Sequence, residues 1–304
     1  MKALEIAFLG NERHLLHALR AMTRYGVYSS NAMQKYTFLL FGDFPQEILR
    51  DQTFQYQYIG DDRIDMESFS DDYDLVLDPE KEFKAGGEYA LSQWFEMKLN
   101  MEHSKKSSPF RLPSLHYHIR ASKFRLQSSQ HQVGNTIFIM PPSPQDLDWH
   151  KLPRCCPPWW ASMVEYLDMS GYSIVYPQVK FESGSRLDNF FDYRFFFTGF
   201  EDVFCNRCYM PECTSINDLN YHLVNSRMYI GWSNLIEDLA AALHIPSIII
   251  HNSSRRESRE IYSVRNDEYL LHHVYFSNPL KWDLDKLKSS IGFIEGRLIP
   301  VALK

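Results

Sequence analysis

Short apolar segments alternate with amphipathic segments over the first hundred residues. Residues 3–9 form an apolar run rich in β-forming side chains, and Gly10 ends it. Apolar side chains within residues 15–22 then recur at the spacing of one helix face. The remaining predicted elements are strands at residues 36–41, 54–59 and 73–78 and a helix at residues 87–100. Strand, tight turn and helix in this order are typical of a Rossmann-like half.

A second series of the same kind follows a polar stretch at residues 101–133, which is rich in Ser, Lys, His and Gln. Its predicted strands are residues 136–140, 172–176, 195–198, 228–231 and 247–251, and its predicted helices are residues 159–169, 216–225 and 235–243. Short connections between strands and helices predict parallel sheets covered by helices. We therefore expect an α/β protein with two Rossmann-like domains, residues 1–133 and 134–279, facing across a cleft. Residues 280–304 contain a helix that we expect to pack back on the first domain.

Composition fits this two-domain prediction. The chain has 304 residues, 44% of them hydrophobic and 23% charged, which is enough for two cores. A net charge of −6 gives no bulk attraction to nucleic acid or anionic lipid. No apolar run approaches the roughly 20 residues of a membrane span, and residues 1–10 are too short and acidic for a signal peptide. We expect a soluble, cytoplasmic protein.

The five cysteines form no obvious disulfide framework, but three of them are closely spaced. Cys205, Cys208 and Cys213 follow the pattern C-x2-C-x4-C. Such thiolates can hold a structural Zn²⁺ or iron ion, with His222, Cys155 or Cys156 as the fourth ligand. The alternative is a set of reduced thiols in an aromatic-rich loop.

The segment that carries most chemistry runs from Met228 to His251. A strand there stops at the start of a helix, where free backbone N–H groups and a partial positive charge suit a diphosphate. Ser233 and Asn234 lie between the two elements, where short polar side chains either cap the helix or bind a ligand. The segment thus predicts a nucleotide-binding element, with a plain helix cap as the alternative for each of these two residues.

This segment resembles the nucleotide-sugar segment of the lipopolysaccharide heptosyltransferase family, which carries Gly-Asn-Asp-Ser/Thr-Gly-x-x-His before a Leu-Ala-Ala-Ala helix. On a gap-free alignment from Gly231, this chain departs from the family at the Asp, Ser/Thr, Gly and His positions, occupied here by Ser233, Asn234, Leu235 and Asp238. A second stretch, from the strand at residues 136–140 to Lys151 and the helix at residues 159–169, resembles the opening of the family's second domain. The resemblance implies a donor site made of Ser233, Asn234, Leu235, Ile236, Asp238, Pro141, Ser143 and Lys151. For Lys151 a solvated loop position is the alternative.

The amino-terminal half resembles the family around Gly10. The residue after that glycine is an aspartate in the family, where it is the presumed general base, and it is Asn11 here. Because an amide cannot accept a proton from a hydroxyl near neutral pH, Glu12 and His14 are the nearest substitutes. Asp78, followed by Glu80 and Lys81, matches a family strand and loop whose residues would meet the acceptor.

The resemblance implies a GT-B glycosyltransferase that moves a sugar from a nucleotide-sugar donor to an acceptor hydroxyl with inversion and without a required cofactor. The acceptor class stays open between saccharide, protein and modified nucleic acid. The sequence is compatible with an oligomer and does not fix the oligomeric state. Two alternatives are a catalytically silent homologue that acts as a binding or scaffold subunit, supported by Asn11, and a nucleotide-sugar epimerase or hydrolase.

Overall fold

The chain folds into two compact units. Unit 1 comprises Met1–Leu115 with Glu257–Asn266, and unit 2 comprises His116–Arg256 with Asp267–Lys304. The computed structural model describes residues 4–26, 36–41, 55–60, 73–83, 91–99, 135–140, 158–179, 206–232, 235–243, 245–251, 271–275 and 284–298. The predicted boundary at residue 133 and the predicted strand at residues 195–198 lie outside these ranges.

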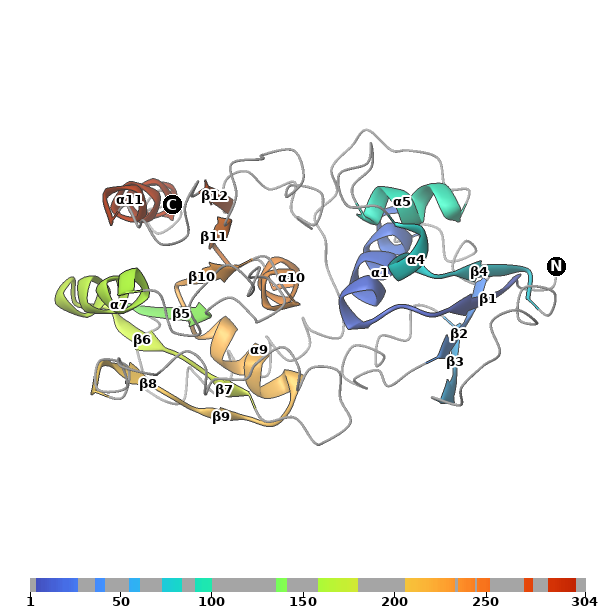
Figure 1. Cartoon of the computed structure of the whole chain (residues 1–304), viewed down its shortest axis with the longest axis horizontal. Coiled ribbons are helices and arrows are strands. Elements are labelled where there is room, and N and C mark those ends of the chain that lie inside the picture. The colour runs from blue at the N-terminus through green and yellow to red at the C-terminus, as the bar shows by residue number, and fades with distance from the viewer. Residues whose placement is uncertain are drawn as a thin grey trace. The chain divides into compact units, whose positions relative to one another are not determined.

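Unit 1 contains a four-stranded parallel sheet in the order β3-β2-β1-β4. Its strands are β1 (Leu4–Phe8), β2 (Tyr36–Phe41), β3 (Gln55–Gly60) and β4 (Leu75–Leu77), and its helices are α1 (Glu12–Gly26), α4 (Pro79–Glu82) and α5 (Leu91–Lys98). Helices α1 and α5 pack against each other and cover one face of the sheet (Figure 1). The four predicted strands and two predicted helices of this half are confirmed, and α4 is an addition.

Aromatic side chains build the core of unit 1. Phe8 is fully buried and lies against Phe38 of the neighbouring strand and Phe95 of α5, with ring centroids 6.2 and 6.0 Å apart. Trp94 meets Phe95 edge to face at 4.9 Å. Because strands of a parallel sheet are buried on both faces, the consecutive residues Ile6, Ala7 and Phe8 of β1 are all apolar and fully buried.

Unit 2 contains a six-stranded parallel sheet in the order β12-β11-β10-β5-β6-β8, the strand order of a doubly wound Rossmann fold. The strands are β5 (Thr136–Met140), β6 (Ser173–Val175), β8 (Cys208–Tyr209), β10 (Met228–Trp232), β11 (Ser247–His251) and β12 (Leu271–Tyr275). The helices are α7 (Pro158–Met169), α9 (Ile216–Val224), α10 (Leu235–Ala242) and α11 (Leu284–Leu298). A two-stranded parallel sheet adds β7 (Gln178–Val179) and β9 (Glu212–Cys213).

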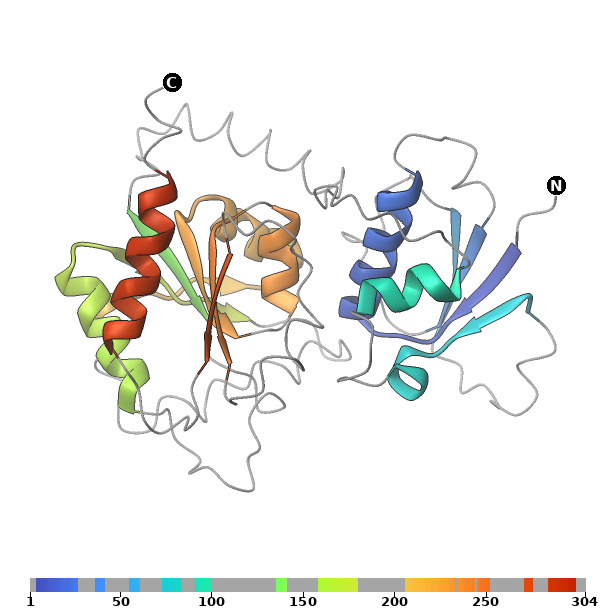
Figure 2. The same cartoon turned by 90° about the horizontal axis from the view of Figure 1, so that it is seen from above.

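Helices cover both faces of this sheet. Figure 2 shows α7 and α11 on one face and α10 on the other. Ile137, Ile139, Ile230 and Ile248 turn to the α7 and α11 side, where they share one core cluster with Trp160. No helix in the described ranges is long and apolar enough to cross a membrane.

The carboxy-terminal helix α11 packs in the core of unit 2. Leu287, Ile291 and Ile294 of α11 are at most 4% exposed and belong to the core cluster of unit 2. Helix α11 contacts β11 and β12, so it is part of the core of unit 2. Its apolar stripe required a partner, but the sequence did not say which sheet supplies it.

Candidate functional site

The carboxyl ends of β1 and β4 meet at one edge of the unit 1 sheet. Phe8 lies opposite Leu77, and the Leu9 N–H donates to the Leu77 carbonyl at 2.9 Å beyond the paired strands. In the order β3-β2-β1-β4 the succession of strands changes direction between β1 and β4. Ligands of open parallel sheets bind at such a point, outside the carboxyl ends of the strands. We call this place, with Asn11, His14, Asp78 and Glu80, the β1/β4 edge.

Asn11 is the N-cap of α1. Its side-chain Oδ1 accepts a hydrogen bond from the His14 N–H at 3.0 Å, and its own backbone N–H donates to His14 Nδ1 at 3.2 Å. This reciprocal pair is a capping box in which a histidine takes the usual place of Glu or Gln. Gly10 is required beside it, because a Cβ at that position would lie 2.8 Å from both His14 Cβ and the Phe8 ring.

Asp78 is the N-cap of α4. It is 8% exposed, its Oδ1 accepts from the Lys81 N–H at 3.2 Å, and Lys81 Nζ lies 3.6 Å from Oδ2. Pro79 follows at the first helical position, where the missing N–H costs nothing. Two predicted catalytic residues, Asn11 and Asp78, thus have defined local roles as caps.

Glu80 is exposed and reaches across to the end of the neighbouring strand. Its Oε1 lies 3.4 Å from Asn11 Nδ2, a contact between residues 69 positions apart in the sequence. Glu12 begins α1, and its side chain lies outside the described part. The structure therefore brings Asn11, His14, Asp78 and Glu80 to one edge.

The corresponding edge of unit 2 lies at the carboxyl ends of β5 and β10. Met140 is opposite Gly231, and the succession of strands changes direction between β5 and β10. Helix α10 begins at Leu235, three residues after β10 ends. The predicted donor residues Pro141, Ser143, Lys151, Ser233 and Asn234 lie outside the described ranges. The described elements place the amino end of α10 where the sequence predicted it.

Three other predicted donor residues have buried side chains. Leu235 is 1% exposed, while Ile236 and Asp238 are fully buried. These side chains are out of reach of a ligand, so only their backbone N–H groups are available to a diphosphate at the start of α10. Glu237 and Asp238 in the first turn carry the charge that complements a helix amino end.

Gly231 allows Tyr229 to fold over the end of β10. A Cβ at position 231 would lie 2.2 Å from the Tyr229 hydroxyl oxygen. The Tyr229 ring is fully buried and packs beside Phe138 of β5, with centroids 6.1 Å apart. The absence of a side chain at Gly231 therefore leaves room for the Tyr229 ring at the end of β10.

The predicted structural metal site is not formed by its described members. Cys208 belongs to the six-stranded sheet and packs against the core cluster, whereas Cys213 belongs to the two-stranded sheet. Both are free thiols. Among the residues that the structure describes, no three His, Cys, Asp or Glu side chains are grouped to hold a metal ion. Cys205, Cys155 and Cys156 lie outside that part of the chain.

Cys213 and His222 lie in buried surroundings. Burial, and then the charge of Asp218, raise the pKa of the Cys213 thiol to about 12. Burial lowers the pKa of His222, and its ring packs edge to face against Tyr209 and Tyr221 at 5.9 and 5.2 Å. These residues are packing groups.

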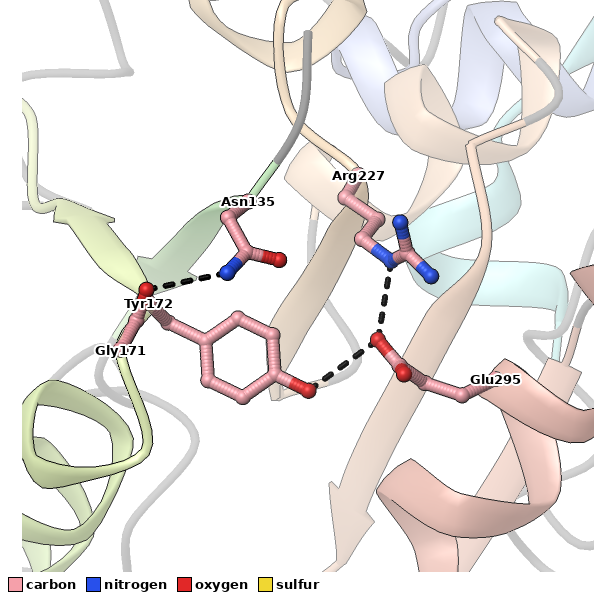
Figure 3. Close-up of polar contacts among 5 residues, drawn as sticks. All are labelled: Asn135, Gly171, Tyr172, Arg227 and Glu295. Atoms are coloured by element: carbon pink, nitrogen blue, oxygen red, sulfur yellow. Dashed lines mark hydrogen bonds and ion pairs between the residues drawn. The ribbon is translucent and has the colours of Figure 1, made fainter.

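A polar cluster that the sequence did not predict lies at the amino ends of β5, β6 and β10. Tyr172 Oη and Arg227 Nε both donate to Glu295 Oε1, at 3.1 and 2.9 Å (Figure 3). Asn135 Nδ2 donates to the Gly171 carbonyl at 3.0 Å. Burial and the Glu295 carboxylate raise the pKa of Tyr172 to about 12. The cluster ties α11 to the sheet at the edge opposite the predicted donor site.

The solved structures that this chain matches include glycosyltransferases. A glycosyl transferase family 9 protein from Veillonella parvula matches 99% of this chain and 98% of its own, at 8% identity and a TM-score of 0.59. The E. coli heptosyltransferase WaaC, solved with ADP, matches 97% and 99% at 10% identity and a TM-score of 0.56. The E. coli ADP-heptose lipopolysaccharide heptosyltransferase II matches 96% and 98% at 9% identity and a TM-score of 0.50.

This chain has the heptosyltransferase fold. The matches run through both units, and the predicted GT-B class with two Rossmann-like parts is confirmed. At 8 to 10% identity they show the fold alone. No protein-family model matches the sequence, and no curated protein matches it.

Proposed function

We propose that this protein is a glycosyltransferase that moves a sugar from a nucleotide-sugar donor to an acceptor hydroxyl with inversion. One observation carries the proposal: the heptosyltransferase fold is retained together with a helix start, that of α10, at the switch point of the unit 2 sheet. We assign the donor to unit 2 and the acceptor to unit 1.

On the donor side, the leaving diphosphate needs positive charge and N–H donors. The free N–H groups at the start of α10 supply donors in a fixed direction, and Ser233 and Asn234 add short polar groups immediately before them. Lys151 adds a positive point charge. These groups would stabilise the charge that develops as the bond to the anomeric carbon breaks, with no metal ion required.

On the acceptor side, an attacking hydroxyl needs a proton acceptor. The β1/β4 edge presents Asp78 and Glu80 beside Asn11, and Glu12 starts the adjacent helix. Inversion follows from one displacement: the acceptor oxygen bonds to the anomeric carbon from the face opposite the departing diphosphate.

A binding subunit without catalysis is the second candidate, and Asn11 favours it. The side chain of Asn11 caps α1 and offers no proton-accepting group. Turnover separates the two functions, because a binding subunit would be stabilised by a nucleotide sugar without releasing nucleotide. An epimerase or hydrolase would release nucleotide or an altered sugar without glycosylating any acceptor, which mass spectrometry of the products detects.

The first experiment is a thermal-shift screen with ADP-, UDP-, GDP- and CMP-sugars. A ligand present at 100 times its Kd stabilises the native state by about 2.7 kcal/mol, which raises the melting temperature of a unit of this size by roughly 5–10 °C. We expect one nucleotide class to produce such a shift. If none of the four classes shifts the melting temperature, the proposal is wrong.

Two lysine variants test the assignment of the donor side. Lys151→Ala is expected to weaken the shift, because it removes a phosphate contact. Lys288→Ala is the matched control, since Lys288 is an exposed residue of α11 that pairs with Asp285. Equal shifts in both variants would exclude Lys151 from the donor site.

A further inference from the structure

We infer that Lys98, seated on the Trp94 ring, is a positioning residue that holds α4 in place through an ion pair with Glu82. This inference rests on the proposed function, because that function assigns the acceptor to unit 1, where α4 forms part of the β1/β4 edge. It follows from the short length of α4, from the contacts that join α4 to α5, and from the attachment of α5 to β1.

Helix α4 is too short to hold its own position. It has four residues, Pro79–Glu82, whereas isolated helices shorter than about 12 residues are marginal in water. Its amino end is capped by Asp78, which directly follows β4. Glu80 reaches the end of β1, but its carboxylate lies 3.4 Å from Asn11 Nδ2, longer than a usual hydrogen bond. The position of α4 therefore depends on contacts at its carboxyl end.

Helix α5 supplies contacts of this kind through two residues one turn apart. Trp94 and Lys98 are four positions apart in α5, so their side chains lie on one face of that helix. The Lys98 ammonium forms an ion pair with Glu82 and lies 5.4 Å from the centre of the Trp94 ring. Phe83, the C-cap of α4, meets the same ring edge to face at 6.2 Å. The carboxyl end of α4 is thus fastened to α5 at one place.

The Trp94 ring makes this ion pair more effective than a pair on an open surface. Exposed pairs usually stabilise little, because ordering two flexible side chains costs entropy. Here the attraction between the ammonium and a ring that is only 5% exposed orders the Lys98 side chain in advance. The side chains of Lys98 and Glu82 are 33% and 35% exposed, so both are partly shielded from water. Lys98 therefore presents an ordered charge to α4.

The same helix is fixed to the strand on the other side of the edge. Phe95 of α5 is fully buried and stacks on Phe8 of β1, with ring centroids 6.0 Å apart. Phe8 lies three residues before Asn11, the cap of α1. Helix α5 thus contacts β1 through Phe95 and α4 through Lys98, and so sets the position of α4 relative to Asn11. A displacement of about 1 Å in a reacting arrangement can cost about 10²-fold in rate.

Millisecond hydrogen exchange tests whether Lys98 holds α4. The probe is the exchange of the amides of residues 81–83, whose N–H groups donate to the carbonyls of Asp78 and Pro79. Lys98→Met keeps an unbranched apolar side chain and removes the charge. Loss of one ion pair and one cation–π contact is expected to raise the exchange rate of these amides by about 3- to 30-fold.

Lys288→Met is the matched control. Lys288 also combines a ring contact with an ion pair, because its ammonium lies 5.3 Å from the centre of the Tyr166 ring and pairs with Asp285. It belongs to α11 of unit 2, so its substitution should leave exchange in α4 unchanged.

Nucleotide release with water as acceptor tests the positioning role, using the nucleotide sugar that gives the largest thermal shift. Lys98→Met is expected to lower kcat by about 3- to 30-fold, because a released α4 must be brought back into place before the acceptor reacts. The KM for the donor should stay the same, since the donor is assigned to unit 2. Lys98→Arg should recover kcat, because arginine keeps both the charge and the ring contact. A merely structural role would leave kcat unchanged well below the melting temperature.

The outcomes separate this inference from the function on which it rests. If the wild-type protein releases no nucleotide, the transferase proposal fails and the positioning role of Lys98 fails with it. If the wild type is active and Lys98→Met has the same kcat as Lys288→Met, the transferase proposal stands and the positioning role is wrong. Equal exchange of α4 in these two variants, a change confined to the donor KM, or a Lys98→Arg variant as slow as Lys98→Met would also overturn it.

Discussion

Ile294→Ala tests whether α11 belongs to the core of unit 2. Ile294 is fully buried and packs with Leu287 and Ile291 against the sheet. Truncation of a buried isoleucine to alanine costs about 2–5 kcal/mol, through lost transfer energy and the cavity that remains. Because Ile294 lies in the last turns of α11, which ends at Leu298, partial collapse should keep the loss near 3 kcal/mol. A unit of this size would melt roughly 6–12 °C lower.

Urea unfolding measures the loss of unfolding free energy, and amide hydrogen exchange shows which strands lose protection. The strands that α11 contacts, β11 and β12, should lose protection, while β1 and β4 of unit 1 keep theirs. Phe293→Ala is the control, because this neighbouring residue is 37% exposed and should cost under 1 kcal/mol. Lost protection in β1 and β4, with β11 and β12 unchanged, would refute the reasoning and restore a helix packed on the first domain.

Two further predictions concern unit 2. Although burial acts to raise it, hydrogen bonds from Thr214 and Ser215 hold the pKa of Asp218 below its usual range. The ionised Asp218 carboxylate therefore stabilises the folded state fully at pH values above the unfolded pKa of about 3.9. This stabilisation is lost as the pH falls through the lower pKa of the folded state. Asp218→Asn should cost about 1 kcal/mol at pH 7 and progressively less below pH ~4, and equal urea-unfolding losses at both pH values would contradict this. Gly231→Ala should lower the free energy of unfolding by about 1–3 kcal/mol, because the added Cβ overpacks against Tyr229. Tyr229→Leu should recover part of that loss in the double variant. Additive losses from the two substitutions would contradict the clash.

The alternating strands and helices could be predicted because each has a local pattern in the sequence, an apolar run for a strand or apolar residues at helical spacing for a helix. The strand β11 has the predicted bounds, and α10 ends one residue early. The strands β8 and β9 were missed because each is two residues long and neither has an apolar run. The strand β12 was missed because His272 and His273 interrupt its apolar residues, a pattern tolerated at the edge of a sheet.

Contacts between distant residues could not be predicted in the same way. The cluster of Tyr172, Arg227 and Glu295 joins positions 68 and 123 residues apart, and no periodicity records such a pairing. The spacing of Cys208 and Cys213 suggested a common metal ion, and the structure places these two residues on strands of different sheets. Sequence spacing sets an upper limit on the distance between two residues but does not record which strands they pair with.

The β1/β4 edge shows how far residue type alone can indicate chemistry. Aspartate is favoured both as a helix cap and as a general acid or base, and asparagine is favoured as a cap, so residue type at the end of a strand does not separate the two uses. The sequence pointed to Asn11 and Asp78 as site residues, and the structure shows both of them as helix caps at one edge of the sheet. A parallel sheet delivers several loops to one edge. Glu80 therefore contacts Asn11 across 69 residues, a pairing that the spacing of the two residues in the sequence does not record.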